Sequence, residues 1–287
     1  MNKKVGIVGN GYVGGATALL ACDNVEVVIY DIDPEKCVPK GSGAEALEGC
    51  DVVFICVPTP MNPDGSCNLD IVNEAVEEAA TRVDRHRIVI KSTVPVGTAS
   101  RLGVCFMPEF LTEANWEEDF ANCEHWIVGE DDSDWVSRDP WGQPTSREIM
   151  EIFAEAEKAQ KIKYLNFNTC TTREAELVKY VRNTYLATKI SYFCEVDRVC
   201  EKMEIEYDTV RELVCLDPRI ESSHTFVPGP DGKKGFGGTC FPKDINSFID
   251  FAKAAGVKTN VMNAAWETNL DVRSEKDWES NKGRSVV

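Results

Sequence analysis

Three glycines near the amino terminus constrain the fold of this chain more than any other feature of its sequence. They form a G-x-G-x-x-G motif over residues 9–14, Gly9-Asn10-Gly11-Tyr12-Val13-Gly14. An apolar, strand-like run at residues 4–9 leads into the motif, and a helix predicted over Ala16–Cys22 follows it. Glycines at this spacing permit a tight turn and let the backbone approach a pyrophosphate at the helix N-terminus. We therefore expect a phosphate-binding turn here.

An acidic residue supports this interpretation. The apolar run Val25–Tyr30 ends directly before Asp31, about 20 residues after the motif, where an acid accepts hydrogen bonds from an adenosine ribose. A carboxylate there also repels the 2′-phosphate of NADP. The sequence therefore predicts a Rossmann site for NAD, formed by the six motif residues and Asp31. Lys36 either lies beside the ribose or is solvated, and both interpretations stay open.

Predicted strands and helices alternate along the first half of the chain. Apolar, β-branched runs at residues 25–30, 51–57, 87–91, 103–106 and 126–129 predict strands, a last strand is predicted at 162–167, and residues 71–83 have a helical pattern. This alternation predicts an α/β fold, with a doubly wound parallel sheet forming an NAD-binding Rossmann domain over residues 1–168.

The pattern changes in the second half of the chain. From Thr172 to Met203 there is no Gly or Pro, and apolar residues recur at helical spacing, which predicts one long helix. We expect this helix to be the centre of an α-helical domain over residues 169–287. A helix of this length commonly spans domains or forms a dimer interface, and we expect a homodimer.

Charge and composition exclude several classes of function. The net charge of −17 argues against a nucleic-acid partner and against adsorption to an anionic membrane. No run of about 20 apolar residues occurs, and glycines interrupt the apolar segment near the N-terminus, so neither a transmembrane helix nor a signal peptide is predicted. The 12 cysteines lack C-x-x-C spacing, so we expect no metal site and a reduced, cytoplasmic protein.

One cysteine lies in a different context from the others. Residues 235–244 read Gly235-Phe236-Gly237-Gly238-Thr239-Cys240-Phe241-Pro242-Lys243-Asp244. Cys240 thus follows a glycine-rich loop and precedes a helix predicted over Asp244–Ala255. The glycines let the backbone approach a ligand closely, and both the helix N-terminus and Lys243 favour a thiolate. The alternative, a buried cysteine beside a loop, is our interpretation of the remaining cysteines.

Five segments resemble motifs of the UDP-glucose/GDP-mannose dehydrogenase family and occur in the family's order. Residues 235–244 closely resemble its active-site signature. Residues 91–98 (K-S-T-V-P-V-G-T), 108–113 (P-E-F-L-T-E), 179–191 (K-Y-V-R-N, then A-T-K-I-S) and 217–220 (D-P-R-I) resemble further family motifs. Ordered matches of this kind are far more specific than any single motif.

The resemblance implies a four-electron oxidation of a nucleotide sugar, UDP-glucose above all, in which the C6 alcohol becomes a carboxylate and two NAD molecules accept hydride. Cys240 would form a thiohemiacetal and then a thioester, which water cleaves. Lys179 and Asn183 lie one helical turn apart and could hold the oxyanion together. Asp244, one turn after Cys240, could orient a water or Lys179.

Two glutamates and a threonine complete the predicted site. Glu109 or Glu113 could act as general base for thioester hydrolysis, and the resemblance favours Glu109. Thr93 would position water and the nicotinamide end. Further predicted cofactor contacts are Val57, Pro58, Thr59, Thr93 and Glu113. The predicted substrate contacts are Glu109, Phe110, Leu111, Glu113, Lys179, Asn183, Arg219, Phe236 and Gly237. The resemblance places Arg219 at the sugar site of the neighbouring subunit.

The resemblance weakens at the end of the sequence. The family continues into a second Rossmann-like domain that grips the nucleotide, and residues 281–287 resemble only its start, so we expect a short form that lacks this domain. Two other functions stay open. A β-hydroxyacid dehydrogenase shares the Rossmann domain and long helix but makes a single hydride transfer without a cysteine nucleophile. A degenerate relative would bind NAD without turnover.

Overall fold

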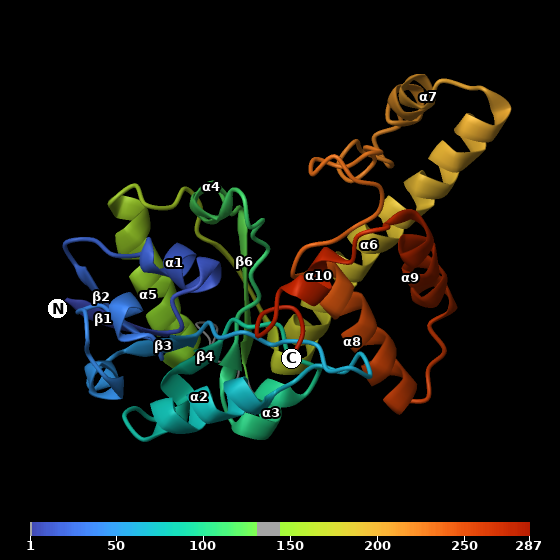
Figure 1. Cartoon of the computed structure of the whole chain (residues 1–287). Coiled ribbons are helices and arrows are strands. Elements are labelled where there is room, and N and C mark those ends of the chain that lie inside the picture. Colours follow the sequence, from blue (N-terminus) through green and yellow to red (C-terminus); the bar gives the residue numbers. More distant parts are fainter. Residues whose placement is uncertain (1, 131–143) are drawn as a thin grey trace. The chain divides into compact units, whose positions relative to one another are not determined.

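The computed structural model describes residues 2–130 and 144–287, which form two compact units (Figure 1). The first, here called the sheet unit, comprises the described residues up to Thr59 together with Leu69–Lys179. The second, the helical unit, comprises Pro60–Asn68 and Tyr180–Val287. The units divide within the long helix, rather than after residue 168 as the sequence suggested, because the first turns of that helix pack on the sheet through Ala175.

Over the residues described, the sheet unit has seven strands in the order β2-β1-β3-β4-β5-β6-β7. Their bounds are β1 Lys3–Val8, β2 Val25–Tyr30, β3 Val52–Ile55, β4 Ile88–Ile90, β5 Cys105–Phe106, β6 His125–Glu130 and β7 Asn166–Thr171. Neighbouring strands run parallel except β5 and β6. The predicted Rossmann-type α/β fold is therefore confirmed, with one antiparallel pair that the sequence did not indicate.

Helices cover both faces of this sheet (Figure 1). Their bounds are α1 Tyr12–Ala18, α2 Asp70–Ala80, α3 Thr98–Leu102, α4 Trp116–Ala121 and α5 Pro144–Lys158, with 3-10 turns η1 Pro34–Lys36, η2 Ala44–Leu47 and η3 Arg85–Arg87. Helices α1, α4 and α5 pack on one face, and α2 and α3 on the other. Because side chains alternate along a strand, Val52 and Phe54 of β3 serve the first face while Val53 and Ile55 serve the second.

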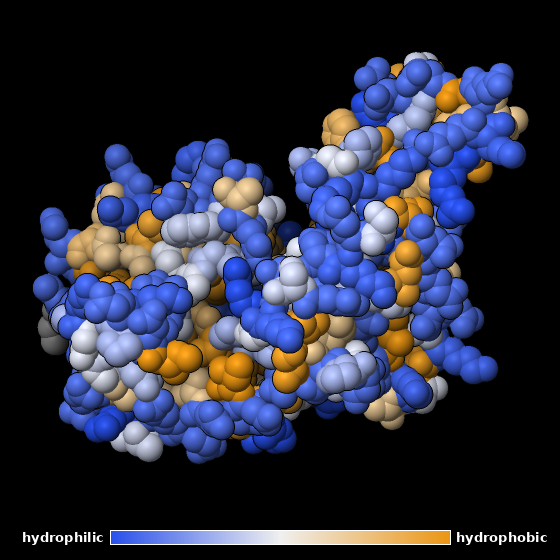
Figure 2. All heavy atoms as spheres, viewed as in Figure 1, coloured by the Kyte–Doolittle hydropathy of each residue, from blue (hydrophilic) through white to orange (hydrophobic). Residues whose placement is uncertain are grey.

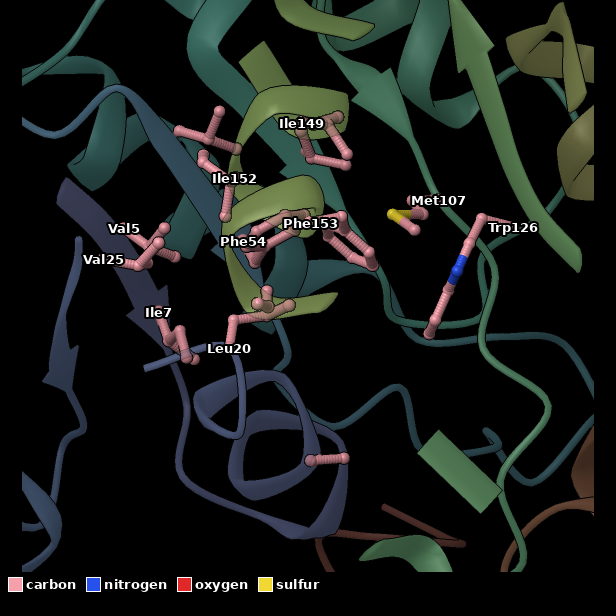
Figure 3. Packing of buried hydrophobic residues seen from close by; sticks show 14 of the residues in the cluster. Val5, Ile7, Leu20, Val25, Phe54, Met107, Trp126, Ile149, Ile152 and Phe153 are labelled. Carbon is pink, nitrogen blue, oxygen red and sulfur yellow. The ribbon is translucent and has the colours of Figure 1, made fainter. Parts of the chain in front are cut away.

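Aromatic packing strengthens the first of these faces (Figure 3). Phe153 of α5 meets Trp126 of β6 edge-on, with ring centroids 4.8 Å apart, and Phe120 of α4 lies 5.2 Å from the same indole. Buried aromatic side chains contribute large apolar areas to a core. The sheet is thus a rigid base for the segments that follow the carboxyl ends of its parallel strands, where most predicted cofactor residues lie.

Two predicted elements are displaced along the chain. Helix α1 begins at Tyr12 and not at Ala16, because its helical hydrogen bonds already start with Gly15 N–H donating to the Gly11 carbonyl at 2.8 Å. Strand β7 begins at Asn166 and not at residue 162. Strand β7 pairs with β6, but its side chains are largely exposed, which agrees with its polar sequence. Ile162, which suggested an earlier start, is a core residue that precedes the strand.

The helical unit is organised by the long helix α6, Thr172–Met203, whose bounds agree with the prediction. The other helices are α7 Tyr207–Val214, α8 Phe241–Ala254, α9 Asn260–Val272 and α10 Asp277–Ser280. One core of this unit is formed by Ala187, Phe236, Ile245 and Ala265, and a second by Phe193, Cys200 and Tyr207. The loop Pro60–Asn68 is tied in where Met61 N–H donates to the Ser285 carbonyl at 2.8 Å.

The face drawn in Figure 2 is mainly hydrophilic, in keeping with the net charge of −17, and apolar side chains interrupt it in a few places. None of the helices in the described residues is both long and apolar enough to cross a membrane.

Candidate active site

The glycine motif forms the turn between β1 and α1, and its glycines serve different purposes. Gly9 has φ +94°, and a Cβ there would lie 2.9 Å from the Cys56 carbonyl oxygen. A Cβ at Gly14 would overlap the Gly9 carbonyl. A Cβ at Gly11 would meet no protein atom within 4 Å, beside the N-terminus of α1. Gly9 and Gly14 are therefore needed for close backbone packing at the turn. Gly11 leaves the open space that a pyrophosphate requires.

Asp31 follows β2, as predicted, and anchors the same turn. Its Oδ2 accepts a hydrogen bond from Asn10 N–H at 2.7 Å, and its Oδ1 accepts one from Asp33 N–H at 2.9 Å. The Asn10 side chain donates to the backbone carbonyl of Lys36 at 2.8 Å. A carboxylate has about four lone-pair sites, so Asp31 can still accept from ribose hydroxyls. Lys36 supports the turn through its backbone, while its side chain is exposed.

The other predicted cofactor residues mostly follow neighbouring parallel strands. Val57, Pro58 and Thr59 come after β3, and Thr93 comes after β4. The Ser92 hydroxyl joins these two segments by donating to the Val57 carbonyl at 2.6 Å. The carboxyl ends of parallel strands are where ligands bind in open α/β sheets. Together with the glycine turn, these residues fit an NAD molecule.

A buried ion pair lies in the sheet unit between two predicted catalytic residues. The Lys179 ammonium donates to Glu109 twice, to Oε1 and to the backbone carbonyl, each at 2.7 Å. Glu109 Oε2 accepts from Leu111 N–H at 2.8 Å, and the Lys179 ammonium lies 5.5 Å from the Phe110 ring centroid. Glu109 is 7% exposed and Lys179 is 3% exposed. Sequence reasoning gave these residues separate roles and did not foresee the pair.

The pair determines the protonation state of the proposed base. Burial alone would raise the pKa of Glu109, but the charge and hydrogen bond of Lys179, with the Leu111 amide, outweigh it, so this pKa lies below its usual value. Glu109 is therefore a carboxylate at neutral pH and can accept a proton. The Lys179 ammonium has three N–H donors, so one remains beyond the two it gives to Glu109.

A second cluster lies in the helical unit around Asp244, which is 1% exposed. Asp244 Oδ2 accepts from the Asn183 side-chain amide at 2.5 Å, and Asp244 Oδ1 contacts the Lys243 ammonium at 2.5 Å. The two carboxylate oxygens of Asp244 thus bind the Asn183 amide and the Lys243 ammonium, both in the helical unit. Asp244 therefore fixes Asn183 in place, a role that the sequence did not indicate. Asn183 still has one amide hydrogen available.

Cys240 occupies the N-cap of α8, three residues closer to the helix than predicted, because α8 begins at Phe241 rather than Asp244. The Lys243 ammonium is buried, and burial alone would lower its pKa. Interactions with Asp244, the largest of them, and with Cys240 outweigh burial and raise the pKa of Lys243 above its usual value. A permanent cation and a helix N-terminus therefore both act on Cys240, the two features that favour a reactive thiolate.

The glycine loop before Cys240 packs closely against the side chain of Asn269. A Cβ at Gly235 would overlap Asn269 Oδ1, so this glycine makes room for a protein side chain and not for a ligand. Phe236 is 3% exposed, its ring packs in the core of the helical unit, and its N–H and carbonyl are both bonded to the Asn269 side chain at 2.7 and 3.0 Å. Phe236 is therefore a core residue of the helical unit, and its predicted contact with substrate stays a prediction.

The remaining predicted substrate residues lie in two places. Phe110 and Leu111 follow Glu109 and are half-buried, whereas Glu113 is exposed. The Arg219 side chain is 86% exposed and is paired with Asp217 of its own loop at 2.5 Å.

Two buried charges were missed by sequence reasoning. Lys91 is 2% exposed, and burial lowers its pKa, while Glu109 acts in the opposite direction. Glu176 accepts from the N–H groups of Gly97 and Ala99 at 2.5 and 2.8 Å, and burial raises its pKa to about 7. The signals were weak but present, because Lys91 begins the K-S-T motif and Glu176 lies on the same helical face as Lys179.

Comparison with known proteins identifies the family of this chain. The NAD binding domain of the UDP-glucose/GDP-mannose dehydrogenase family matches residues 39–155, and the central domain of the same family matches residues 173–271. The UDP-glucose 6-dehydrogenase TuaD of Bacillus subtilis is 28% identical over 312 residues, covering 93% of this chain and 63% of the relative. The UDP-glucose 6-dehydrogenase of Pseudomonas aeruginosa is 31% identical over 264 residues, covering 85% and 54%.

A solved structure has the same fold. The UDP-glucose dehydrogenase of the hyperthermophilic archaeon Pyrobaculum islandicum superimposes with a TM-score of 0.76 at 29% identity, covering 94% of this chain and 68% of that one. The chain spans between half and two thirds of the length of the two curated relatives. The match to the NAD binding domain and the geometry of the glycine turn assign NAD as the cofactor. This chain belongs to the UDP-glucose/GDP-mannose dehydrogenase family.

Proposed function

We propose that this protein oxidises the C6 alcohol of a nucleotide sugar, with UDP-glucose as the first candidate, to the carboxylate. The observation that carries the proposal is Cys240 at the N-cap of α8, next to the permanently charged Lys243. A simple alcohol oxidation needs no nucleophile. A cysteine in this setting suits a reaction that captures an aldehyde and carries it on to the acid.

The proposed reaction consists of two oxidation steps and one hydrolysis step. NAD, when bound, accepts hydride, and two equivalents are consumed per sugar. The alcohol becomes an aldehyde by losing a hydride to NAD and its hydroxyl proton to solvent. The Cys240 sulfur then adds to the carbonyl carbon, and the carbonyl oxygen takes up a proton, which gives a thiohemiacetal. Loss of the second hydride and of this hydroxyl proton gives a thioester. Water then attacks the carbonyl carbon, the carbon–sulfur bond breaks, and the acid and the Cys240 thiol are released.

The other residues receive roles that suit their contacts. Glu109, ionised and buried, takes the proton of the attacking water. Lys179 and Asn183, one turn apart on α6, use their remaining N–H groups to stabilise negative charge on the sugar oxygen. Asp244 keeps Asn183 and Lys243 in position. Thr93, which follows β4, positions water near the nicotinamide.

The NADH yield tests this function directly. Purified protein is incubated with NAD and with UDP-glucose, UDP-N-acetylmannosamine, UDP-galactose or GDP-mannose in turn, while absorbance and product acid are measured. We expect two NADH per molecule of acid with the true substrate. One NADH per product, with an aldehyde or ketone as the product, would point to the β-hydroxyacid type of dehydrogenase. Tight NAD binding with no turnover on any sugar would indicate a degenerate binding protein.

We also propose that the protein is a homodimer built on α6. Five large apolar side chains of this helix are 49–64% exposed: Val181, Tyr185, Tyr192, Val199 and Met203. At 3.6 residues per turn they fall within about 40° of arc around the helix axis. A continuous exposed stripe of this kind is the face that a helix normally buries against a partner. A second copy of α6 supplies a matching stripe.

Charge placed on this stripe should separate the subunits. We expect the wild type to have twice the mass of one chain by light scattering at micromolar concentration. A Tyr185→Glu/Val199→Glu variant should be monomeric, because two buried, unpaired carboxylates cannot be accommodated in an apolar interface. Arg198→Glu, exposed on the same helix outside the stripe, serves as the matched control and should stay dimeric. A monomeric wild type would contradict the proposal.

A further inference from the structure

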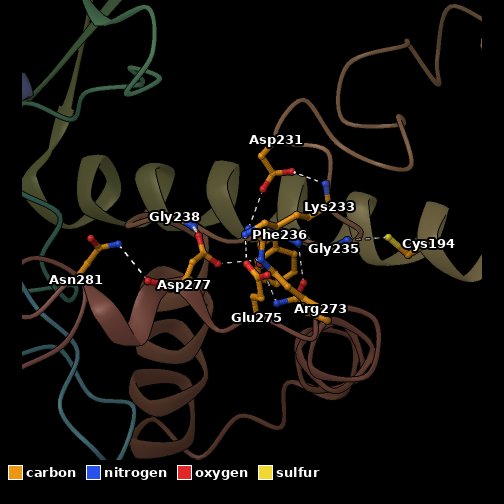
Figure 4. A network of polar contacts seen from close by, with 11 residues as sticks. Cys194, Asp231, Lys233, Gly235, Phe236, Gly238, Arg273, Glu275, Asp277 and Asn281 are labelled. Atoms are coloured by element: carbon orange, nitrogen blue, oxygen red, sulfur yellow. Dashed lines mark hydrogen bonds and ion pairs between the residues drawn. The ribbon is translucent and has the colours of Figure 1, made fainter.

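The loop that leads to Cys240 is closed by side chains from beyond α9 (Figure 4). Arg273 Nη2 donates to Asp231 Oδ2 at 2.7 Å, at the beginning of the loop. Arg273 Nε donates to Asp277 Oδ1 at 2.9 Å, and Asp277 Oδ2 accepts from Gly238 N–H at 2.8 Å, at the end of the loop. One guanidinium therefore connects both ends of the segment 231–238.

The contacts are buried and leave little freedom. Arg273 is 3% exposed, and a Cβ at Gly237 would overlap both its Nη2 and Asp277 Oδ1. Only glycine at position 237 therefore permits this approach. Gly238 has φ +73°, a conformation that also favours glycine. The close fit of Arg273 and Asp277 thus explains the glycine at position 237.

Two further observations indicate that this arrangement holds a charged network and not ordinary packing. Burial would raise the pKa of Asp277, but its hydrogen bonds to Arg273 and to Gly238 N–H outweigh burial and lower it, so Asp277 is ionised. Arg273 Nη1 is buried and has no hydrogen-bond partner in the described part of the chain. Arg273 is therefore buried with one N–H group unpaired, while its other nitrogens bind the carboxylates of Asp231 and Asp277.

We propose that Arg273 and Asp277 are positioning residues for Cys240: by closing the loop, they set the backbone two residues before the cysteine and so place its sulfur at the N-terminus of α8, beside Lys243. Neither residue touches the reacting atoms. The consequence for catalysis rests on the proposed function, whereas the consequence for the reactivity of the thiol does not.

Alkylation of Cys240 by iodoacetamide tests the proposal without any substrate. The rate is measured at pH 7 by peptide mapping with mass spectrometry, on the folded protein. For Asp277→Ala we expect a rate constant lower by about tenfold or more, because a thiolate displaced from a helix N-terminus and a cation loses its activation. Asp277→Asn should lose less, since its amide oxygen can still accept from Gly238 N–H.

The neighbouring carboxylate supplies a matched control. Glu275 pairs only at the surface with Lys233, so Glu275→Gln should alkylate at the wild-type rate. If Asp277 merely stabilised the fold, Asp277→Ala would have a lower melting temperature but an unchanged alkylation rate in the folded protein. That result would overturn the proposal. A higher rate would overturn it as well.

A second variant keeps the test decisive if Asp277→Ala does not fold. Asp231 is half-exposed, and Asp231→Ala removes one of the two carboxylates that hold Arg273. The alkylation rate of Asp231→Ala should be lower than that of Glu275→Gln. An equal rate would contradict the proposed role of Arg273. If the protein proves to be the proposed dehydrogenase, Asp277→Ala should also lower kcat by about 100-fold with little change in KM, the size expected for a misplacement of about 1 Å.

Discussion

A Cys240→Ser variant should form no detectable acid from the nucleotide sugar, because its rate of acid formation should be lower by about 10³-fold or more. A serine hydroxyl is a much poorer nucleophile at neutral pH, and neither Lys243 nor the α8 N-terminus can ionise it to a useful extent. Product acid is measured by chromatography. The matched control is Cys67→Ser. Cys67 lies in the electrostatic field of the same Lys243, but burial raises its pKa to about 11, so it stays a thiol and its variant should remain active.

Glu109→Gln distinguishes capture of the aldehyde from release of the acid. Glutamine retains an oxygen that can accept from Lys179 but cannot act as a base. We expect a burst of two NADH per site followed by slow turnover, with a thioester adduct visible by intact-protein mass spectrometry. Prior alkylation of Cys240 should prevent the adduct. Steady turnover of Glu109→Gln at the wild-type rate would remove Glu109 from the hydrolysis step.

The fold could be predicted from the sequence where periodic signals are strong. The long helix α6 and strand β2 were placed to the residue, because neither contains Gly or Pro and each has a clear apolar pattern. Two failures have physical causes. The polar edge strand β7 has no apolar alternation. Helix α8 begins three residues before the predicted Asp244, and its first turn contains Pro242, a position where proline is well tolerated.

Motifs in the sequence named candidate residues for the site, but the contacts between these residues could not be predicted. Motifs identified Glu109 and Lys179, yet the ion pair between them joins positions 70 residues apart, which leaves no periodic trace in the sequence. The same holds for Asn183 and Asp244, which lie 61 residues apart. Contacts of this length depend on the packing of whole elements.

Glycines illustrate the same limit. In both glycine-rich segments the sequence suggested close approach of a ligand. At Gly11 the structure leaves such space. Gly9 instead accommodates the Cys56 carbonyl after β3, Gly14 accommodates the Gly9 carbonyl, and Gly237 accommodates Arg273. A missing Cβ shows that something lies close but not whether it is a ligand or the protein itself.

Breaking the buried ion pair should cause the largest loss of stability. In Lys179→Met the Glu109 carboxylate loses the cation that outweighs its burial, and removal of one partner from a buried pair typically costs about 3–5 kcal/mol. The free energy of unfolding is measured by urea titration with circular dichroism. Lys158→Met breaks an exposed pair with Glu155 and should leave the free energy of unfolding unchanged within error.

The pH dependence identifies the charge responsible. In the wild type the pKa of Glu109 is lowered, so its contribution to stability is present above the ordinary glutamate pKa of about 4.3 and is lost as the pH falls through the lowered value. In Lys179→Met, burial of Glu109 is opposed only by the Leu111 N–H and by the charge of Lys91. We therefore expect the pKa of Glu109 to rise, so that the variant loses stability as the pH rises through it. The difference between the two proteins should therefore be larger at pH 7 than at pH 5.

A Lys179→Met/Glu109→Gln variant should recover most of the loss at pH 7, because it removes the buried carboxylate that the Lys179→Met variant leaves without its cation. A difference that is independent of pH, or a double variant as unstable as the single one, would mean that the methylenes of Lys179, and not its charge, stabilise this site.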